Sequence, residues 1–134
     1  MIGASRTLSV SIARPPADVY AFVSDAANLP QWAAAFCQSV RRAGAEWIVE
    51  TPQGPVRLRF VTWNQWGVLD HHVTLSSGEQ VVNPMRVIPN GSGSEVLFTL
   101  FQRPGRTDVQ FYEDAILVQR DLESLKRLLE GSTR

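Results

Sequence analysis

The sequence has few of the residues that build a disulfide framework or a metal site. It contains one cysteine, Cys37, and two histidines in 134 residues. A single cysteine excludes an internal disulfide and a cysteine-rich zinc site, and it fits the reducing cytoplasm, where we expect the protein. The two histidines are the neighbours His71 and His72, which point to opposite faces of a strand and do not chelate one ion together. We expect no metal and no cofactor.

An excess of charge of one sign and a long apolar run are also missing. Thirteen lysines and arginines balance thirteen aspartates and glutamates, so nothing predicts a nucleic-acid surface. No apolar run approaches the roughly 18 residues of a membrane span, and the first residues lack the apolar stretch of a signal peptide, so we expect no membrane insertion. The composition is that of a globular protein, with 44% hydrophobic and 19% charged residues, and the length predicts one domain over residues 1–134.

The N-terminal part of the chain predicts one strand followed by two short helices. Residues 7–13 alternate apolar and polar side chains, which is typical of a strand with one buried face. Pro15 and Pro16 end that strand and suit the first turn of a helix, which the following apolar residues continue at helical spacing. After a break at Pro30, the alanine-rich residues 31–36 favour a second short helix.

The middle of the chain predicts an antiparallel meander. Apolar and polar side chains alternate almost throughout, and turn residues such as glycine, proline and asparagine interrupt the alternation. The connections are too short for parallel crossovers, which need a dozen or more residues. The expected strands are 39–42, 47–50, 56–63, 68–75, 80–88 and 95–102.

The last segment predicts one long amphipathic helix. Thr107 and Gln110 form a capping box, in which each side chain satisfies the backbone amide of the other residue. Six apolar residues then recur at spacings of three and four and lie within about 40° of one line on the helix, and Gly131 ends it. They are Phe111, Ala115, Val118, Leu122, Leu125 and Leu129.

This order of elements resembles the helix-grip fold of the SRPBCC superfamily. That superfamily includes START lipid-transfer domains, birch-pollen-allergen-type carriers and polyketide cyclase/dehydrase-like proteins. The resemblance covers nearly the whole chain and depends on residues 10–25, with their strand, prolines and helix, and on the turn 28–32, where Trp32 matches the superfamily's tryptophan. Residues 67–72 and 98–105 are similar to an uncharacterised polyketide cyclase-like branch.

The resemblance implies an α+β fold. A curved antiparallel sheet of six to seven strands would wrap around the long C-terminal helix, with two short helices after the first strand. Because a curled sheet that grips a helix does not pack fully at its centre, we expect a cavity there for a small apolar ligand. Residues expected to bind the ligand are Trp32, Leu58, Phe60, Leu69, His71, Arg86, Phe111, Tyr112, Asp114, Ala115 and Val118.

His71 is the first candidate for chemistry. It shares its strand parity with Leu69 and Val73, so its ring is expected to face the cavity. A ring with a near-neutral pKa could transfer protons there, although a buried histidine held for structural reasons is more common. On the other face of the strand, Asp70 is expected to orient His72 in a surface pair.

Asp114 is the second candidate. It lies about 60° from the apolar line of the helix, where it can border the cavity and pair with Arg86 or His71. The alternative is a carboxylate that only stabilises the helix N-terminus. Asp121, about 80° from the line, is expected to reach a surface cation.

Three functions remain open from the sequence. The first is a carrier or sensor that buries a small hydrophobic or polyketide-like ligand. The second is a cofactor-independent cyclase or dehydratase, with His71 as general acid or base and Asp114 or Arg86 orienting a carbonyl. The third is an interaction module or homodimer, because residues 96–101 are apolar on both parities and one face then needs a cover.

Overall fold

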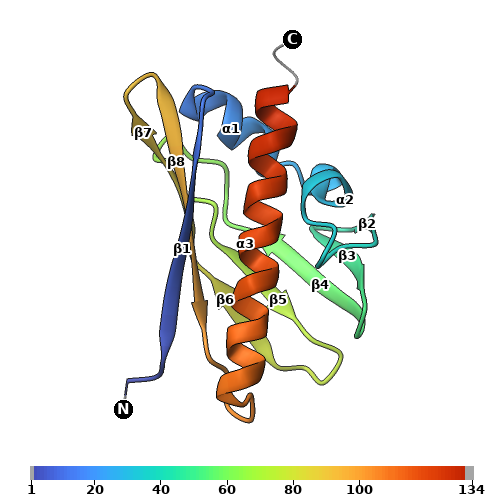
Figure 1. The fold of residues 1–134 in the computed structure, drawn as a ribbon. Helices are drawn as coiled ribbons and strands as arrows, with labels where there is room; N and C mark the ends of the chain where they lie inside the picture. The colour runs from blue at the N-terminus through green and yellow to red at the C-terminus, as the bar shows by residue number, and fades with distance from the viewer. Residues whose placement is uncertain (1, 132–134) are drawn as a thin grey trace.

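A computed structural model describes residues 2–131, and within them the chain has the predicted α+β fold (Figure 1). The elements run in the predicted order of strand, short helices, meander and long helix. They are β1 (Ser5–Ile12), α1 (Pro16–Val23), the 3₁₀ helix η1 (Ala26–Asn28), α2 (Leu29–Trp32), β2 (Ser39–Ala43), β3 (Glu46–Thr51), β4 (Gly54–Phe60), β5 (His71–Thr74), β6 (Gln80–Asn83), β7 (Met85–Asn90), β8 (Gly93–Phe101) and α3 (Asp108–Gly131).

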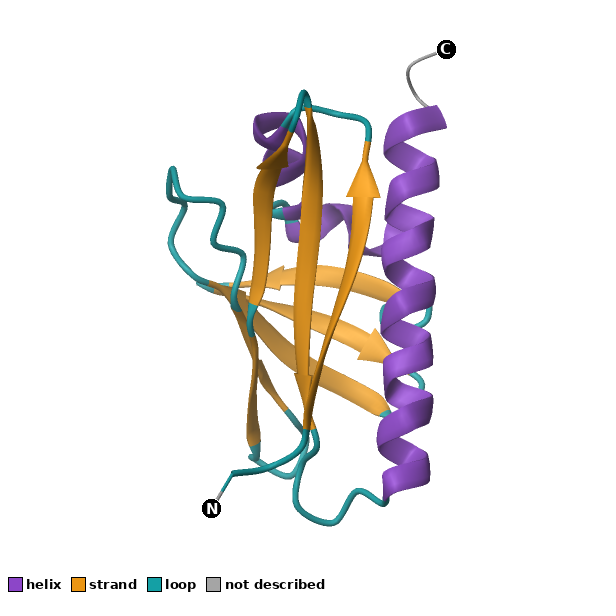
Figure 2. Cartoon of the chain, turned by 60° about the vertical axis from the view of Figure 1, so that its left-hand side comes forward, coloured by secondary structure: helices purple, strands orange, loops and turns teal. Residues whose placement is uncertain are grey.

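The strands form two antiparallel ladders beside α3. The smaller has the order β1-β8-β7 and the larger the order β2-β3-β4-β5-β6. Figure 2 shows the strands of the smaller sheet running along the helix, whereas strands of the larger sheet run across it. This curvature of the β-layer around one long helix confirms the helix-grip architecture.

Pro84 explains why the described chain has eight strands instead of six to seven. The sequence predicts one strand over residues 80–88, but the structure divides it into β6 and β7 on either side of Pro84. Proline has no N–H to donate to a ladder, so a continuous strand through this position would lose a bond. The next amide, Met85 N, donates instead to Oδ1 of Asp70 at 2.8 Å.

The expected strand 68–75 is shortened for a related reason. Its first residues pair with β7 instead, because Leu69 N donates to Met85 O at 2.8 Å and Val87 N donates to Gly67 O at 2.9 Å. Its later residues form β5, which lies between β4 and β6. Gly67 has a φ of +73°, and a Cβ there would lie 2.1 Å from Val87 O, so only glycine fits. Segment 67–74 therefore joins the two sheets.

The long helix begins with the predicted capping box. Gln110 N donates to Thr107 Oγ1 at 3.1 Å, and Thr107 N donates to Gln110 Oε1 at 2.9 Å. Its 24 residues span about 36 Å. Towards its end, Leu125 and Leu129 belong to one buried cluster with Ile12 of β1 and Val19 of α1. No helix within residues 2–131 is long and apolar enough to cross a membrane.

Candidate functional site

A cavity of about 840 Å³ lies between the larger sheet, α2 and the first two thirds of α3. The inward set of β4 and β5 supplies its apolar floor, as the alternation of those strands predicts. Leu58, Phe60 and Val73 belong to this set, and Phe98 of β8 joins them. Arg57 and Arg59 are exposed on the opposite face of β4. Strand parity therefore decides which side chains enter the cavity.

His71 lies inside this cavity, as its parity predicts, with 8% of its surface exposed. Its ring lies between Phe60 and Phe98, at centroid distances of 5.2 and 5.6 Å. Nδ1 is 3.1 Å from the carbonyl oxygen of Leu69, so Nδ1 carries the proton and Nε2 is an acceptor. Burial lowers the pKa of His71 below its ordinary 6.5 and keeps the ring neutral at pH 7.

Asp114 also lines the cavity, but its partner is not one of the two predicted. Arg106, in the loop before α3, donates to both carboxylate oxygens, at 2.7 Å from Nη2 and 3.2 Å from Nε. The expected pairing with Arg86 or His71 is therefore wrong. Arg103, which also lines the cavity, pairs with Glu79 at 3.1 Å. These two ion pairs give one end of the cavity a polar border.

Arg86 lies on another part of the fold. It pairs with Asp70, which also accepts the Met85 amide, so the predicted surface pair of Asp70 with His72 is wrong. The reason is the strand break at Pro84, which leaves the Met85 amide beside Asp70. The guanidinium of the next residue, Arg86, then lies close to the same carboxylate. Arg86 is not among the residues that line the cavity.

The surroundings of Asp121 were also predicted wrongly. It is 8% exposed and lines the cavity instead of reaching a surface cation. Its Oδ1 accepts a hydrogen bond from Ala35 N at 3.2 Å, just after α2. Burial raises the pKa of this carboxyl to about 6, although the Ala35 bond and Arg120 oppose the shift. Oδ2 has no hydrogen-bond partner within residues 2–131.

A signal for Asp121 was present in the sequence. Asp114 and Asp121 are seven residues apart, so they lie on the same flank of the apolar line. Leu117 lies between them and also lines the cavity. Because Asp114 was expected to border the cavity, its shared flank indicated that Asp121 borders the cavity as well, and the segment after α2 covers it there.

The other predicted ligand-binding residues divide into two groups. Trp32, Leu58, Phe60 and Val118 line the cavity together with His71 and Asp114. Leu69, Phe111 and Ala115 are buried but do not line it, and Tyr112 is 56% exposed under the guanidinium of Arg6. The indole Nε1 of Trp32 is buried without an acceptor among the described residues. Whether any of these residues contacts a ligand stays a prediction.

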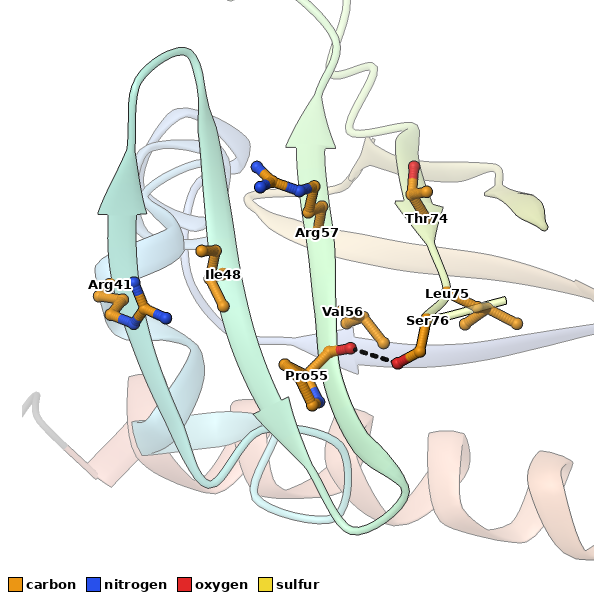
Figure 3. Close-up of a pocket in the computed structure, with 8 residues that line it drawn as sticks. All are labelled: Arg41, Ile48, Pro55, Val56, Arg57, Thr74, Leu75 and Ser76. Atoms are coloured by element: carbon orange, nitrogen blue, oxygen red, sulfur yellow. Dashed lines mark hydrogen bonds between the residues drawn. The ribbon is translucent and has the colours of Figure 1, made fainter. Parts of the chain in front are cut away.

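A second, smaller hollow of about 340 Å³ lies on the opposite face of the larger sheet (Figure 3). Arg41, Ile48, Arg57 and Thr74 form one row across neighbouring strands there. Arg57 pairs with Glu46 at 3.4 Å. Within residues 2–131, no buried polar atom without a partner belongs to a residue of this hollow, whereas Trp32 of the larger cavity has one, so the larger cavity is the candidate site.

Solved structures with the same fold come from several kinds of protein. XoxI from Bacillus cereus is 16% identical with a TM-score of 0.75, and the match covers 93% of this chain and 94% of that one. DynU16 of the dynemicin biosynthetic locus is 17% identical with a TM-score of 0.73, over 96% of this chain and 48% of that one. Aha1 from Colwellia psychrerythraea, solved as a dimer, is 14% identical with a TM-score of 0.74, over 95% and 96%. At these identities the likeness establishes the fold alone.

The family assignment comes from the sequence. None of the curated proteins matches the chain. The model of one family, described as polyketide cyclase / dehydrase and lipid transport, matches residues 4–130. This range includes every element of the fold except the last residue of α3, Gly131, and every residue that lines the cavity. The chain therefore belongs to the polyketide cyclase / dehydrase and lipid transport family, within the SRPBCC superfamily.

Proposed function

We propose that the protein binds a small hydrophobic or polyketide-like molecule in the cavity between α3 and the larger sheet. The observation that carries this proposal is the cavity itself: it has a volume of about 840 Å³ and a mostly apolar floor. Ligand sites typically have volumes of about 300 to 1,000 Å³ and combine apolar walls with a few polar groups that orient the ligand. His71, Asp114 and Asp121 are polar groups of this kind. The family's description as one of lipid transport supports the same function.

Native mass spectrometry of the protein purified from its own host tests this proposal directly. A ligand held in the cavity adds a defined mass to the intact protein, and denaturation releases it. A matched pair of variants shows where the ligand is held. Val118→Trp places a large side chain in the cavity, and we expect it to abolish the added mass. Ile116→Trp makes the same change on the exposed face of α3 and is expected to leave it unchanged.

Equal ligand retention by both variants would contradict binding in this cavity. The same variants can be titrated with naphthalene by calorimetry, which requires no knowledge of the natural ligand. Thermal unfolding of each variant shows whether it is folded. An 840 Å³ cavity has room for an indole, so we expect Val118→Trp to keep its fold.

The second candidate is a cofactor-independent enzyme of the cyclase or dehydratase type. The observation that favours it is the state of His71: a neutral ring whose Nε2 has no partner among residues 2–131 and which lines an apolar cavity. A general base needs this free lone pair, and the lowered pKa keeps it available at neutral pH. His71→Ala is expected to cut turnover by about 10²- to 10⁴-fold if the ring transfers protons. In a carrier, the same variant is expected to change ligand affinity by less than about tenfold.

A homodimer through the outer face of the last strands stays a prediction. Phe101 of β8 is 48% exposed and Ile88 of β7 is 42% exposed, so apolar surface is available on both strands. The mass of the native protein, measured in the same experiment, tests this prediction.

A further inference from the structure

The described chain has four buried polar or charged residues, and only two of them offer a free atom to the cavity. The four are Thr51, His71, Ser94 and Asp121. The Thr51 hydroxyl donates a hydrogen bond to Gly54 O at 2.6 Å. The Ser94 hydroxyl donates one to Arg14 O at 2.7 Å, and Ser94 does not line the cavity. His71 and Asp121 each use one polar atom on the backbone, at Leu69 O and Ala35 N. Nε2 and Oδ2 remain without partners.

Both free atoms are acceptors at neutral pH. Nε2 has a lone pair because Nδ1 holds the proton of the neutral ring. Oδ2 of an ionised carboxylate only accepts, and a carboxyl with a pKa of about 6 is mostly ionised at pH 7.5. Neither atom is fully enclosed, because among the described residues the fully buried side-chain atom without a partner is Nε1 of Trp32, so both are open to a molecule in the cavity. A bound molecule that covers such an acceptor without donating to it leaves the acceptor unpaired at a cost in free energy, so a molecule that donates a hydrogen bond is favoured.

We propose that Asp121 is a ligand-binding residue and that, together with His71, it selects apolar ligands that carry a hydroxyl over ligands that carry a carboxylate. This inference rests on the cavity-binding function proposed above and names the chemical class of the ligand. A hydroxyl donates its proton to either free acceptor. An ionised carboxylate has no proton to donate and is repelled by Asp121. Of the arginines that line the cavity, Arg103 and Arg106 already pair with Glu79 and Asp114, and Arg120 is exposed to solvent. Trp32 also lines the cavity, and its Nε1 is a donor without a partner among the described residues, to which the oxygen of a hydroxyl can serve as acceptor.

Three probes of nearly equal size and shape test the selection by calorimetric titration of the wild-type protein at about pH 7.5. Naphthalene measures apolar burial alone, naphthol adds one donor, and naphthoate adds an anion. Hydrogen bonds to charged groups are strong enough for an effect of about tenfold, so we expect naphthol to bind about ten times more tightly than naphthalene. Naphthoate is expected to bind more weakly than both.

Asp121→Asn tests the residue itself. Its amide oxygen can keep the bond from Ala35 N, and its NH₂ group then takes the place of Oδ2 and presents a donor to the cavity. We expect the naphthol affinity to fall by about tenfold and the naphthoate affinity to rise. The matched control is Glu123→Gln, which removes the same charge two residues along α3 on its exposed face. It should leave all three affinities unchanged.

The outcomes separate the two proposals. If naphthalene binds but naphthoate binds as tightly as naphthol, the selection is overturned while the cavity proposal stands. The selection is also overturned if Asp121→Asn keeps the wild-type ratio of affinities. If none of the three probes binds, the cavity proposal falls and this inference falls with it. The wild-type ranking needs no variant, so the test holds even if Asp121→Asn folds poorly.

Discussion

The two halves of α3 differ in what lies against them, although one apolar line runs along the whole helix. In the C-terminal half, which we call the filled half, Leu125 and Leu129 are buried in one cluster with side chains of β1, β8 and α1. The part of the helix that precedes Leu125, which we call the hollow half, lines the cavity through Asp114, Leu117, Val118, Arg120, Asp121 and Leu122. Figure 1 shows α1 beside the filled half, whereas β4 and β5 pass behind the middle of the helix.

The polar residues follow the same division. Asp114 and Asp121 are both in the hollow half, and His71 faces it from the sheet. A carboxylate in place of Leu125 or Leu129 in the filled half would be buried without room for a partner, which costs several kcal/mol. The hollow half accepts carboxylates because the cavity leaves space beside them. We infer that the filled half supplies most of the stability and that the hollow half supplies the polar groups for function.

The largest expected effect is a difference in stability between two leucines of the same helix. Leu125 is fully buried in the filled half, so Leu125→Ala removes packed methyl groups and leaves a void. We expect a loss of about 2 to 5 kcal/mol in the free energy of unfolding. Leu117, in the hollow half, is 40% exposed and borders a cavity that already exists, so Leu117→Ala should cost less than about 1 kcal/mol.

Urea unfolding of both variants measures this difference. A loss on Leu117→Ala as large as that on Leu125→Ala would show that the hollow half is as tightly packed as the filled half. The division of α3 would then be wrong.

Local patterns in the sequence predicted the parts of the fold that depend on local rules. The capping box at Thr107 fixed the start of α3, and the period of two placed His71 inside and Arg57 outside. Both rules act over a few residues, so neighbouring side chains are enough to apply them. The missing N–H of Pro84 also favours a strand break at this position. The break was not predicted because apolar and polar residues alternate on both sides of the proline.

The partners of the charged residues could not be predicted in the same way. A helical projection gives the angle of Asp121 from the apolar line, but not which other element covers that flank. The cover is α2, whose following amide at Ala35 is 86 residues away in the sequence. Asp114 likewise pairs with Arg106, which lies in an irregular loop where no periodic pattern predicts the direction of a side chain. Such contacts are set by tertiary packing, which a single sequence does not display.

The smaller expected effect concerns the cost of placing Asp121 in the hollow half. Its pKa is about 6 in the folded protein and 3.8 for the ordinary side chain, so the folded state binds more protons between these values. Its contribution to stability is therefore fully present below about pH 4 and is lost as the pH rises through 6. Asp121→Asn removes the charge and can keep the bond from Ala35. We expect it to raise the free energy of unfolding by about 1 to 3 kcal/mol at pH 8 and to change it little at pH 4.

Urea unfolding of wild type and Asp121→Asn at both pH values measures this effect. His71 has the opposite dependence, since its lowered pKa contributes stability above 6.5 that is lost at lower pH, but it is present in both proteins and cancels in their difference. Glu123→Gln serves as the control and should show no difference at either pH, because Glu123 is exposed. If Asp121→Asn is no more stable than wild type at pH 8, the carboxylate is not strained by burial. If it is more stable and yet loses the preference for naphthol, the charge destabilises the empty protein and is useful only when a ligand occupies the cavity.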